Sequence, residues 1–106
     1  MARTRFSLAT CNLYNLNLPG LPMYRDASGW THAEYDAKLA WMAQALVHVN
    51  VDVWGFQELW HAQALGEVFE RAGLGGDYEL LAPAGHAGRK IVCAGAVRKG
   101  MPAGEP

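Results

Sequence analysis

Cysteine, long apolar runs and an excess of positive charge are all scarce or missing in this chain of 106 residues. Its two cysteines, Cys11 and Cys93, are too few for a disulfide framework. Each lies in an apolar run, so we expect both to be small buried side chains. No stretch is long enough to cross a bilayer, and the basic start is not followed by a signal-peptide core. These absences favour a cytoplasmic protein without a membrane span.

The balance of charge limits the partners. Nine Lys and Arg against ten Asp and Glu give a net charge of -1, which is not the basic surface typical of nucleic-acid-binding proteins. Because a bound cation can supply positive charge locally, nucleic acid stays open as a substrate although the charge does not indicate it. Apolar residues make up 51% of the chain, which suits a single small globular unit over residues 1–106.

The apolar pattern alternates between the periods of strands and helices. Thr31 and Glu34 form a capping-box pattern, which predicts that a helix begins there and runs to about Val49. A second helix should end at Gly73, a typical C-terminal cap. The predicted elements are a strand at 5–11, a long ordered loop at 13–30, a helix at 31–49, a strand at 53–56, a helix at 61–72, a strand at 78–82, a loop at 83–89 and a strand at 90–97. We also expect Trp30, Trp41, Val47 and Trp54 to belong to the apolar interior.

This order predicts an α/β fold with an incomplete sheet. Strands separated by a helix favour parallel pairing of the first two strands, and the last two can form a hairpin. No helix follows the last strand, so one face of the sheet should stay uncovered. Such a face exposes apolar area and strand edges, so we expect it to bind the remainder of a longer parent chain or a second copy.

Two polar side chains follow predicted strands at the point where each strand ends. Glu58 comes after the buried strand 53–56, and Asn12 comes after the strand at 5–11. The carboxyl ends of parallel strands are where ligand sites form in such sheets, and a carboxylate there is suited to Mg²⁺. The alternatives are an ordinary Glu at a helix start and an Asn that stabilises a turn. The presence of both residues favours a ligand site more strongly than either residue does alone.

These residues lie in two motifs that resemble the endonuclease/exonuclease/phosphatase (DNase I-like) superfamily. The run Thr10-Cys11-Asn12 resembles its first motif, in which Asn ends the first strand. The run from Asp52 to Glu58, Asp-Val-Trp-Gly-Phe-Gln-Glu, resembles its second motif, and residues 90–99 resemble a later strand that ends in a basic residue. The resemblance covers nearly the whole chain, as the N-terminal portion of one such domain.

The resemblance implies a four-layer α/β/β/α sandwich and a metal-dependent phosphoesterase. In that family water attacks a phosphodiester or phosphomonoester with the help of Mg²⁺ or Mn²⁺. Carried over to this chain, Glu58 would be the metal ligand, Asn12 its neighbour in the catalytic and metal site, and Gln57 a supporting residue. The substrate would be a phosphate ester of DNA, RNA, a phospholipid, an inositol phosphate or a small molecule.

Two departures from the family pattern qualify this interpretation. Tyr14 stands where some members have an acidic residue two positions after the Asn. The later motifs, which supply Asp, Asn and a terminal Asp-His pair, have no counterpart in this sequence. We therefore expect little catalysis from these 106 residues alone. The competing hypothesis is a non-catalytic α/β interaction or structural domain on the same scaffold.

Overall fold

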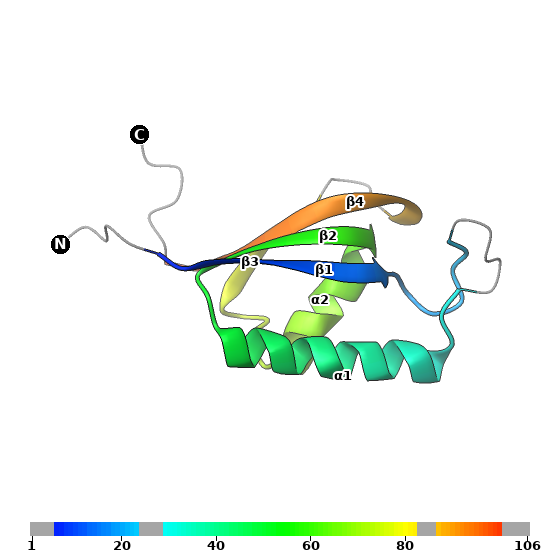
Figure 1. Cartoon of the computed structure of the whole chain (residues 1–106), viewed down its shortest axis with the longest axis horizontal. Helices are drawn as coiled ribbons and strands as arrows, with labels where there is room; N and C mark the ends of the chain where they lie inside the picture. The colour runs from blue at the N-terminus through cyan, green and yellow to red at the C-terminus, as the bar shows by residue number, and fades with distance from the viewer. Residues whose placement is uncertain (1–5, 24–28, 83–86, 101–106) are drawn as a thin grey trace.

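The computed structural model describes residues 6–23, 29–82 and 87–100. In chain order the elements are β1 (Leu8–Leu16), α1 (His32–Val49), β2 (Val53–His61), α2 (Ala62–Arg71), β3 (Tyr78–Leu81) and β4 (Ala87–Arg98). The four strands form a single mixed sheet in the order β1-β2-β4-β3. The predicted α/β class is therefore confirmed. Both helices lie on the same side of the sheet (Figure 1), so the described part of the chain has two layers.

The strand pairing follows the order of the elements. β1 and β2, which are joined through α1, pair in parallel, whereas β4 pairs antiparallel with both β2 and β3. A parallel pair needs a long crossover between its strands, and α1 supplies it. Both predicted pairings, the parallel first pair and the antiparallel last pair, are confirmed.

Helix α1 begins as its sequence predicts. The Glu34 amide donates to the Thr31 hydroxyl at 3.1 Å, and the Thr31 amide donates to the Glu34 carboxylate at 2.9 Å. These two bonds complete a capping box. The helix presents a buried stripe to the sheet, formed by Tyr35, Leu39, Met42, Ala43 and Leu46.

Trp41, Val47 and Val49 are apolar residues of α1 that do not join that stripe. Trp41 is 61% exposed and Val47 is 54% exposed, so the prediction that they widen the apolar face was wrong. Each residue of an α-helix is rotated by about 100° from its neighbour. Trp41 and Val47 directly adjoin the buried Met42 and Leu46, and that rotation turns them toward solvent.

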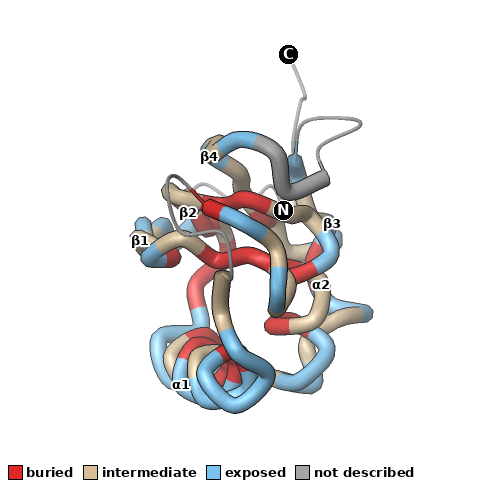
Figure 2. The backbone as a smooth tube through the Cα atoms, turned by 90° about the vertical axis from the view of Figure 1, so that its right-hand side faces the viewer, coloured by how far each residue is buried: buried red, intermediate tan, exposed pale blue. Residues whose placement is uncertain are grey.

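The core lies between the sheet and the helices. A row of aromatic rings connects the elements across it: Trp54 stacks on Phe56 at 5.6 Å between centroids, Phe56 meets Phe69 at 6.1 Å, and Phe69 meets Tyr78 at 5.2 Å. These contacts join β2, α2 and β3 into one cluster. Viewed end-on, the strands lie over α1, which keeps the buried residues between the layers (Figure 2).

The opposite face of the sheet is not covered by any residue within 6–23, 29–82 or 87–100. Leu8 is 62% exposed there, and Cys93 is exposed on the same face. The prediction of a buried Cys93 was wrong because alternation along β4 turns Ala94 and Ala96 toward the core and Cys93 away from it. Cys11 faces the helices and is half-buried.

Several boundaries differ from the predicted ones. β1 continues to Leu16 because Leu13 and Leu16 bury completely against the core, at 1% and 0% exposure. β2 continues through Gln57 and Glu58 instead of ending at Phe56. Helix α2 begins one residue later than predicted, because the ring nitrogen Nδ1 of His61 accepts from the Gln63 amide at 3.1 Å and caps the helix.

The start of β4 is a further difference, whereas the end of α2 agrees with the prediction. β4 begins at Ala87, inside the loop predicted for 83–89, of which residues 83–86 lie outside the described part. Gly73 follows α2 with a φ of 75°, and this left-handed conformation ends the helix as predicted. Within the described ranges, neither helix combines the length and the apolar character that crossing a membrane would require.

Candidate functional site

The site residues predicted from the sequence meet inside β1 and β2, where the regular parallel pairing of the two strands breaks off, and not at their carboxyl ends. The register places Asn12 beside Gln57, directly before Glu58. The Asn12 amide nitrogen donates a hydrogen bond of 2.8 Å to the Glu58 carboxylate. The expected convergence of these two side chains from neighbouring parallel strands is therefore confirmed, and Gln57 lies next to them.

Glu58 reaches this position through an irregularity in β2. Phe56 pairs with Ala94 and Leu59 pairs with Val92, so Gln57 and Glu58 together face a single residue of β4. This is a β-bulge, a feature that bends a strand and redirects its side chains. Trp54 and Phe56 point into the core before the bulge, and Leu59 does so after it. Regular alternation would have turned Glu58 into the core.

The backbone at Glu58 carries strain. Its φ is 62°, in the left-handed region that residues with a Cβ atom seldom adopt. Such conformations cost free energy and cluster at functional sites, where surrounding contacts hold them in place. A Gly would be the ordinary choice for this backbone, so the presence of a Glu indicates that the side chain itself matters.

The opposing segment of β1 is irregular as well. Tyr14 and Asn15 also have positive φ values, 50° and 60°. The Tyr14 amide donates to the Asn12 side-chain oxygen at 2.7 Å, which orients the amide so that its nitrogen faces Glu58. The indole N–H groups of Trp30 and Trp60 donate to the main-chain and side-chain oxygens of Asn15 at 2.8 and 3.0 Å.

These hydrogen bonds define the role that Asn12 can take. Its side-chain oxygen already accepts from Tyr14, and its nitrogen donates to Glu58. This arrangement favours an Asn12 that orients the Glu58 carboxylate, with Glu58 as the group that holds a cation. Partners of this kind fix ligand geometry in metal sites.

Lys38 of α1 is a site neighbour that the sequence did not reveal. Its ammonium nitrogen lies 5.0 Å from the ring centroid of Trp30 and 5.6 Å from that of Tyr14. Burial lowers the pKa of Lys38, while the charges of Glu58 and Cys11 act in the opposite direction. Burial also raises the pKa of the Cys11 thiol, which Lys38 partly offsets. A single Lys on a helix has no local signal, because only tertiary structure brings it to this site.

A depression of about 520 Å³ adjoins the pair. Gln57 and Glu58 of β2 line it together with Ile91, Val92 and Cys93 of β4. The Gln57 carboxamide and the Glu58 carboxylate therefore both border a space that a small ligand could enter. Apolar β4 side chains form its opposite wall.

The donor set suits a hard cation only in part. Mg²⁺ often binds through one or two carboxylates and keeps several waters. Glu58 supplies one such carboxylate, with Asn12 beside it. Across the part of the chain that the structure describes, no group of three or more His, Cys, Asp and Glu residues could enclose a metal ion. The residues therefore fit a cation held at one edge by Glu58 and completed by water or substrate oxygens.

Asp52 belongs to the second motif but lies at the other end of β2. It is 5% exposed, and its carboxylate accepts from Arg98 at 3.0 Å and from the Ser7 amide at 3.0 Å. These bonds tie the ends of three strands together. The geometry therefore gives Asp52 a structural role, and it also gives one to Arg98, the basic residue that ends the later strand.

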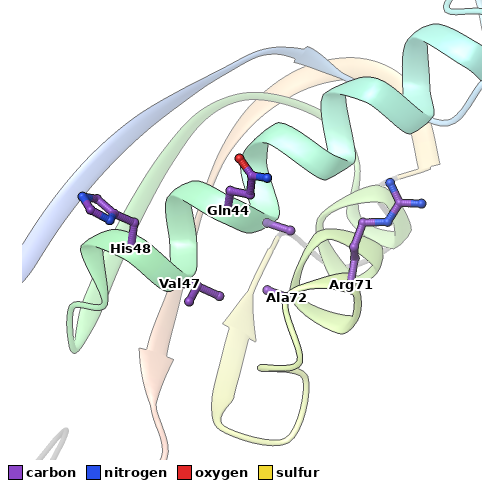
Figure 3. Close-up of a pocket in the computed structure, with 6 residues that line it drawn as sticks. Gln44, Val47, His48, Arg71 and Ala72 are labelled. Atoms are coloured by element: carbon purple, nitrogen blue, oxygen red, sulfur yellow. The ribbon is translucent and has the colours of Figure 1, made fainter.

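A second depression, of about 510 Å³, lies between the two helices. Val47 of α1 and Ala72, which directly follows α2, point toward one another across it (Figure 3). Arg71 at its border is engaged in an ion pair with Asp36. The groove is distant from Asn12 and Glu58 in the fold and presents no pair of groups suited to acid–base chemistry.

The three histidines in the described part of the chain contribute little to the site, and His86 lies outside that part. His32 and His48 are exposed on α1, and the Nδ1 atom of His61 caps α2. Comparison with known proteins adds no further information about the site, because no protein-family model, no curated protein and no solved structure matches this chain.

Proposed function

We propose that this chain carries one edge of a metal-dependent phosphoesterase site of the endonuclease/exonuclease/phosphatase type. Glu58 would be the ligand of Mg²⁺ or Mn²⁺, Asn12 its orienting partner, and Gln57 a supporting amide. The observation that carries the proposal is the 2.8 Å hydrogen bond between Asn12 and Glu58, where the regular pairing of two parallel strands breaks off. Ligand sites in open α/β sheets form toward the carboxyl ends of the strands.

The chemistry proposed is hydrolysis of a phosphate ester by water. When bound, a divalent cation neutralises charge on the phosphate oxygens and activates water for attack on phosphorus. Glu58 contributes the anionic oxygens that hold the cation. Asn12 keeps that carboxylate in a single orientation, and the Gln57 amide borders the adjoining depression.

The strain at Glu58 supports a functional role over a purely structural one. A Glu at a helix start needs neither a β-bulge nor a positive φ, and Glu58 has both. Bulges that redirect a side chain are frequent next to active sites. The four-layer sandwich of the proposed family would place a second sheet on the face that includes Leu8 and Cys93.

One carboxylate is too little for efficient catalysis. We therefore expect the 106-residue chain to bind Mn²⁺ weakly and to show no phosphodiesterase activity above background. A complete site would draw its other acidic and basic groups from further protein. Clear metal-dependent hydrolysis of a generic phosphodiester by the purified chain would contradict this part of the proposal.

The test is Mn²⁺ binding, measured by calorimetry or by the loss of the free-Mn²⁺ electron paramagnetic resonance signal. Glu58→Gln keeps the shape of the side chain but removes the charge, and we expect it to weaken binding at least about tenfold. Glu79→Gln is the matched control, because Glu79 is exposed on β3 at the far edge of the sheet. Equal binding by the wild-type chain and both variants would refute the proposed metal site.

The second candidate is a non-catalytic α/β interaction or structural domain. The absence of three clustered metal ligands within the described residues favours it. Under this hypothesis Glu58→Gln would change neither Mn²⁺ binding nor any other ligand interaction. The same titration therefore separates the two candidates.

A further inference from the structure

Lys38 carries a half-buried ammonium group. Among residues 6–23, 29–82 and 87–100 it has no hydrogen bond and no ion pair, and its contacts are the faces of Trp30 and Tyr14. An ammonium group carries three N–H donors. A partly desolvated cation with free donors is costly unless an anion or water satisfies it.

The two rings fix where this ammonium group lies. Each cation–π contact attracts the Lys38 nitrogen to a ring face. Both rings are themselves anchored to the turn that follows Asn12. The Tyr14 amide bonds the Asn12 side chain, and the Trp30 indole bonds the Asn15 carbonyl. Lys38 is thus held next to the segment that orients Glu58.

Tyr14 connects Lys38 to the site, because Lys38 contacts its ring and its amide donates to Asn12. Glu58 and Cys11 are the groups whose charges act on it. Glu58 accepts a hydrogen bond from Asn12, and within the described part of the chain it forms no ion pair with Lys38, so both charges stay available to a ligand. A ligand that carries anionic oxygens and also binds a cation held by Glu58 would satisfy both.

We propose that Lys38 is an anion-binding residue of this site and that it holds the phosphate group of the substrate by charge-assisted hydrogen bonds. This inference deepens the proposed function and rests on it for the identity of the substrate. It assigns the ligand class as a phosphate ester with at least one free anionic oxygen. Trp30 and Tyr14 act as positioning residues for Lys38.

The probe is inorganic phosphate, whose binding to the full 106-residue chain is measured by calorimetry and by ³¹P line broadening, with and without Mn²⁺. Lys38→Met retains the length of the stem and removes the charge. We expect it to weaken phosphate binding about tenfold in both conditions. Lys38→Arg should retain most of the binding, which also shows that the site tolerates substitution there.

Lys99→Met is the matched control, because Lys99 is exposed at the opposite end of β4. It should bind phosphate like the wild-type chain. Unchanged phosphate binding in Lys38→Met, an equal loss in Lys99→Met, or no phosphate binding by the wild-type chain would each overturn the inference.

The design separates this inference from the proposed metal site. Mn²⁺ binding should survive Lys38→Met, because the variant keeps Glu58, and should be lost in Glu58→Gln. If the wild-type chain binds phosphate but no Mn²⁺, and Lys38→Met loses the phosphate binding, the Lys38 anion site is supported and the metal site is refuted. If Glu58→Gln loses Mn²⁺ binding but Lys38→Met binds phosphate like the wild-type chain, only the role of Lys38 is refuted.

Discussion

Asn12 and Glu58 form their hydrogen bond across two strands that are both irregular at the point of contact. The bond measures 2.8 Å, although Glu58 lies in a β-bulge with a φ of 62° and Tyr14 and Asn15 lie in left-handed conformations. Two irregular segments therefore converge on one polar contact, and a further register shift lies between Leu59 and His61 of β2. Substitutions at position 58 can test whether its backbone is strained.

Glu58→Gly and Glu58→Ala should differ in stability. Both variants lose the carboxylate and its bond to Asn12, but only Gly adopts a φ of 62° without a steric penalty. We expect Glu58→Gly to be more stable than Glu58→Ala by about 1 kcal/mol in urea unfolding. Equal stabilities would mean that position 58 is not strained.

The buried pair of Asp52 and Arg98 should contribute more to stability than the exposed pair of Asp36 and Arg71. Asp52 is 5% exposed and also accepts from Ser7. Because Asp52→Asn leaves the Arg98 charge without its partner, we expect a loss of about 2 kcal/mol in urea unfolding.

Asp36→Asn is the control for that measurement, since the Asp36 side chain is 66% exposed. Its expected loss is at most about 0.5 kcal/mol. Similar losses in the two variants would show that the Asp52 cluster does not hold the three strand ends together.

The stability of the protein should fall at alkaline pH through Tyr35. Its hydroxyl donates to Glu67, and burial, that hydrogen bond and the Glu67 charge together raise the pKa of Tyr35 well above 10.0. Because the folded state keeps the proton longer than the unfolded state, this contribution is fully present below pH 10 and is lost as the pH rises through the raised value.

Tyr35→Phe should remove this pH dependence. We expect a loss of about 1 to 2 kcal/mol at neutral pH, because the hydrogen bond to a charged acceptor disappears. Above pH 10 the unfolding free energy of the variant should decline less steeply than that of the wild-type protein. Parallel curves across that range would rule out Tyr35 as the titrating group.

The uncovered face of the sheet should make the protein associate with itself. Four strands spaced by about 4.8 Å and on average about 28 Å long present roughly 540 Å². A symmetric pair would therefore bury on the order of 1,000 Å², near the lower limit for a specific interface. We expect a weak dimer whose population rises with concentration in sedimentation velocity.

Leu8→Lys should reduce that association, because Leu8 is 62% exposed on this face. Trp41→Lys is the control, since Trp41 is 61% exposed on α1, on the other side of the molecule. A monomer at all concentrations, or an equal effect of both substitutions, would show that the sheet face is not the contact.

The elements that depend on local signals were predictable. The capping box of Thr31 and Glu34 set the start of α1, and Gly73 marked the end of α2. Placing Asn12 and Glu58 at the ends of predicted parallel strands was enough to predict that they meet. In each case the relevant residues are close in sequence, or their positions follow from the order of strands and helices.

The sequence by itself therefore determined the alternation of strands and helices, the parallel first pair, and the meeting of Asn12 with Glu58. Only the tertiary structure decided the bulge at Glu58, the position of Lys38 beside it, and the solvent exposure of Trp41 and Cys93. The physical reason is that strand register and side-chain facing result from packing between distant segments. Hydrogen bonds and burial over the whole sheet outweigh the preference of any single residue.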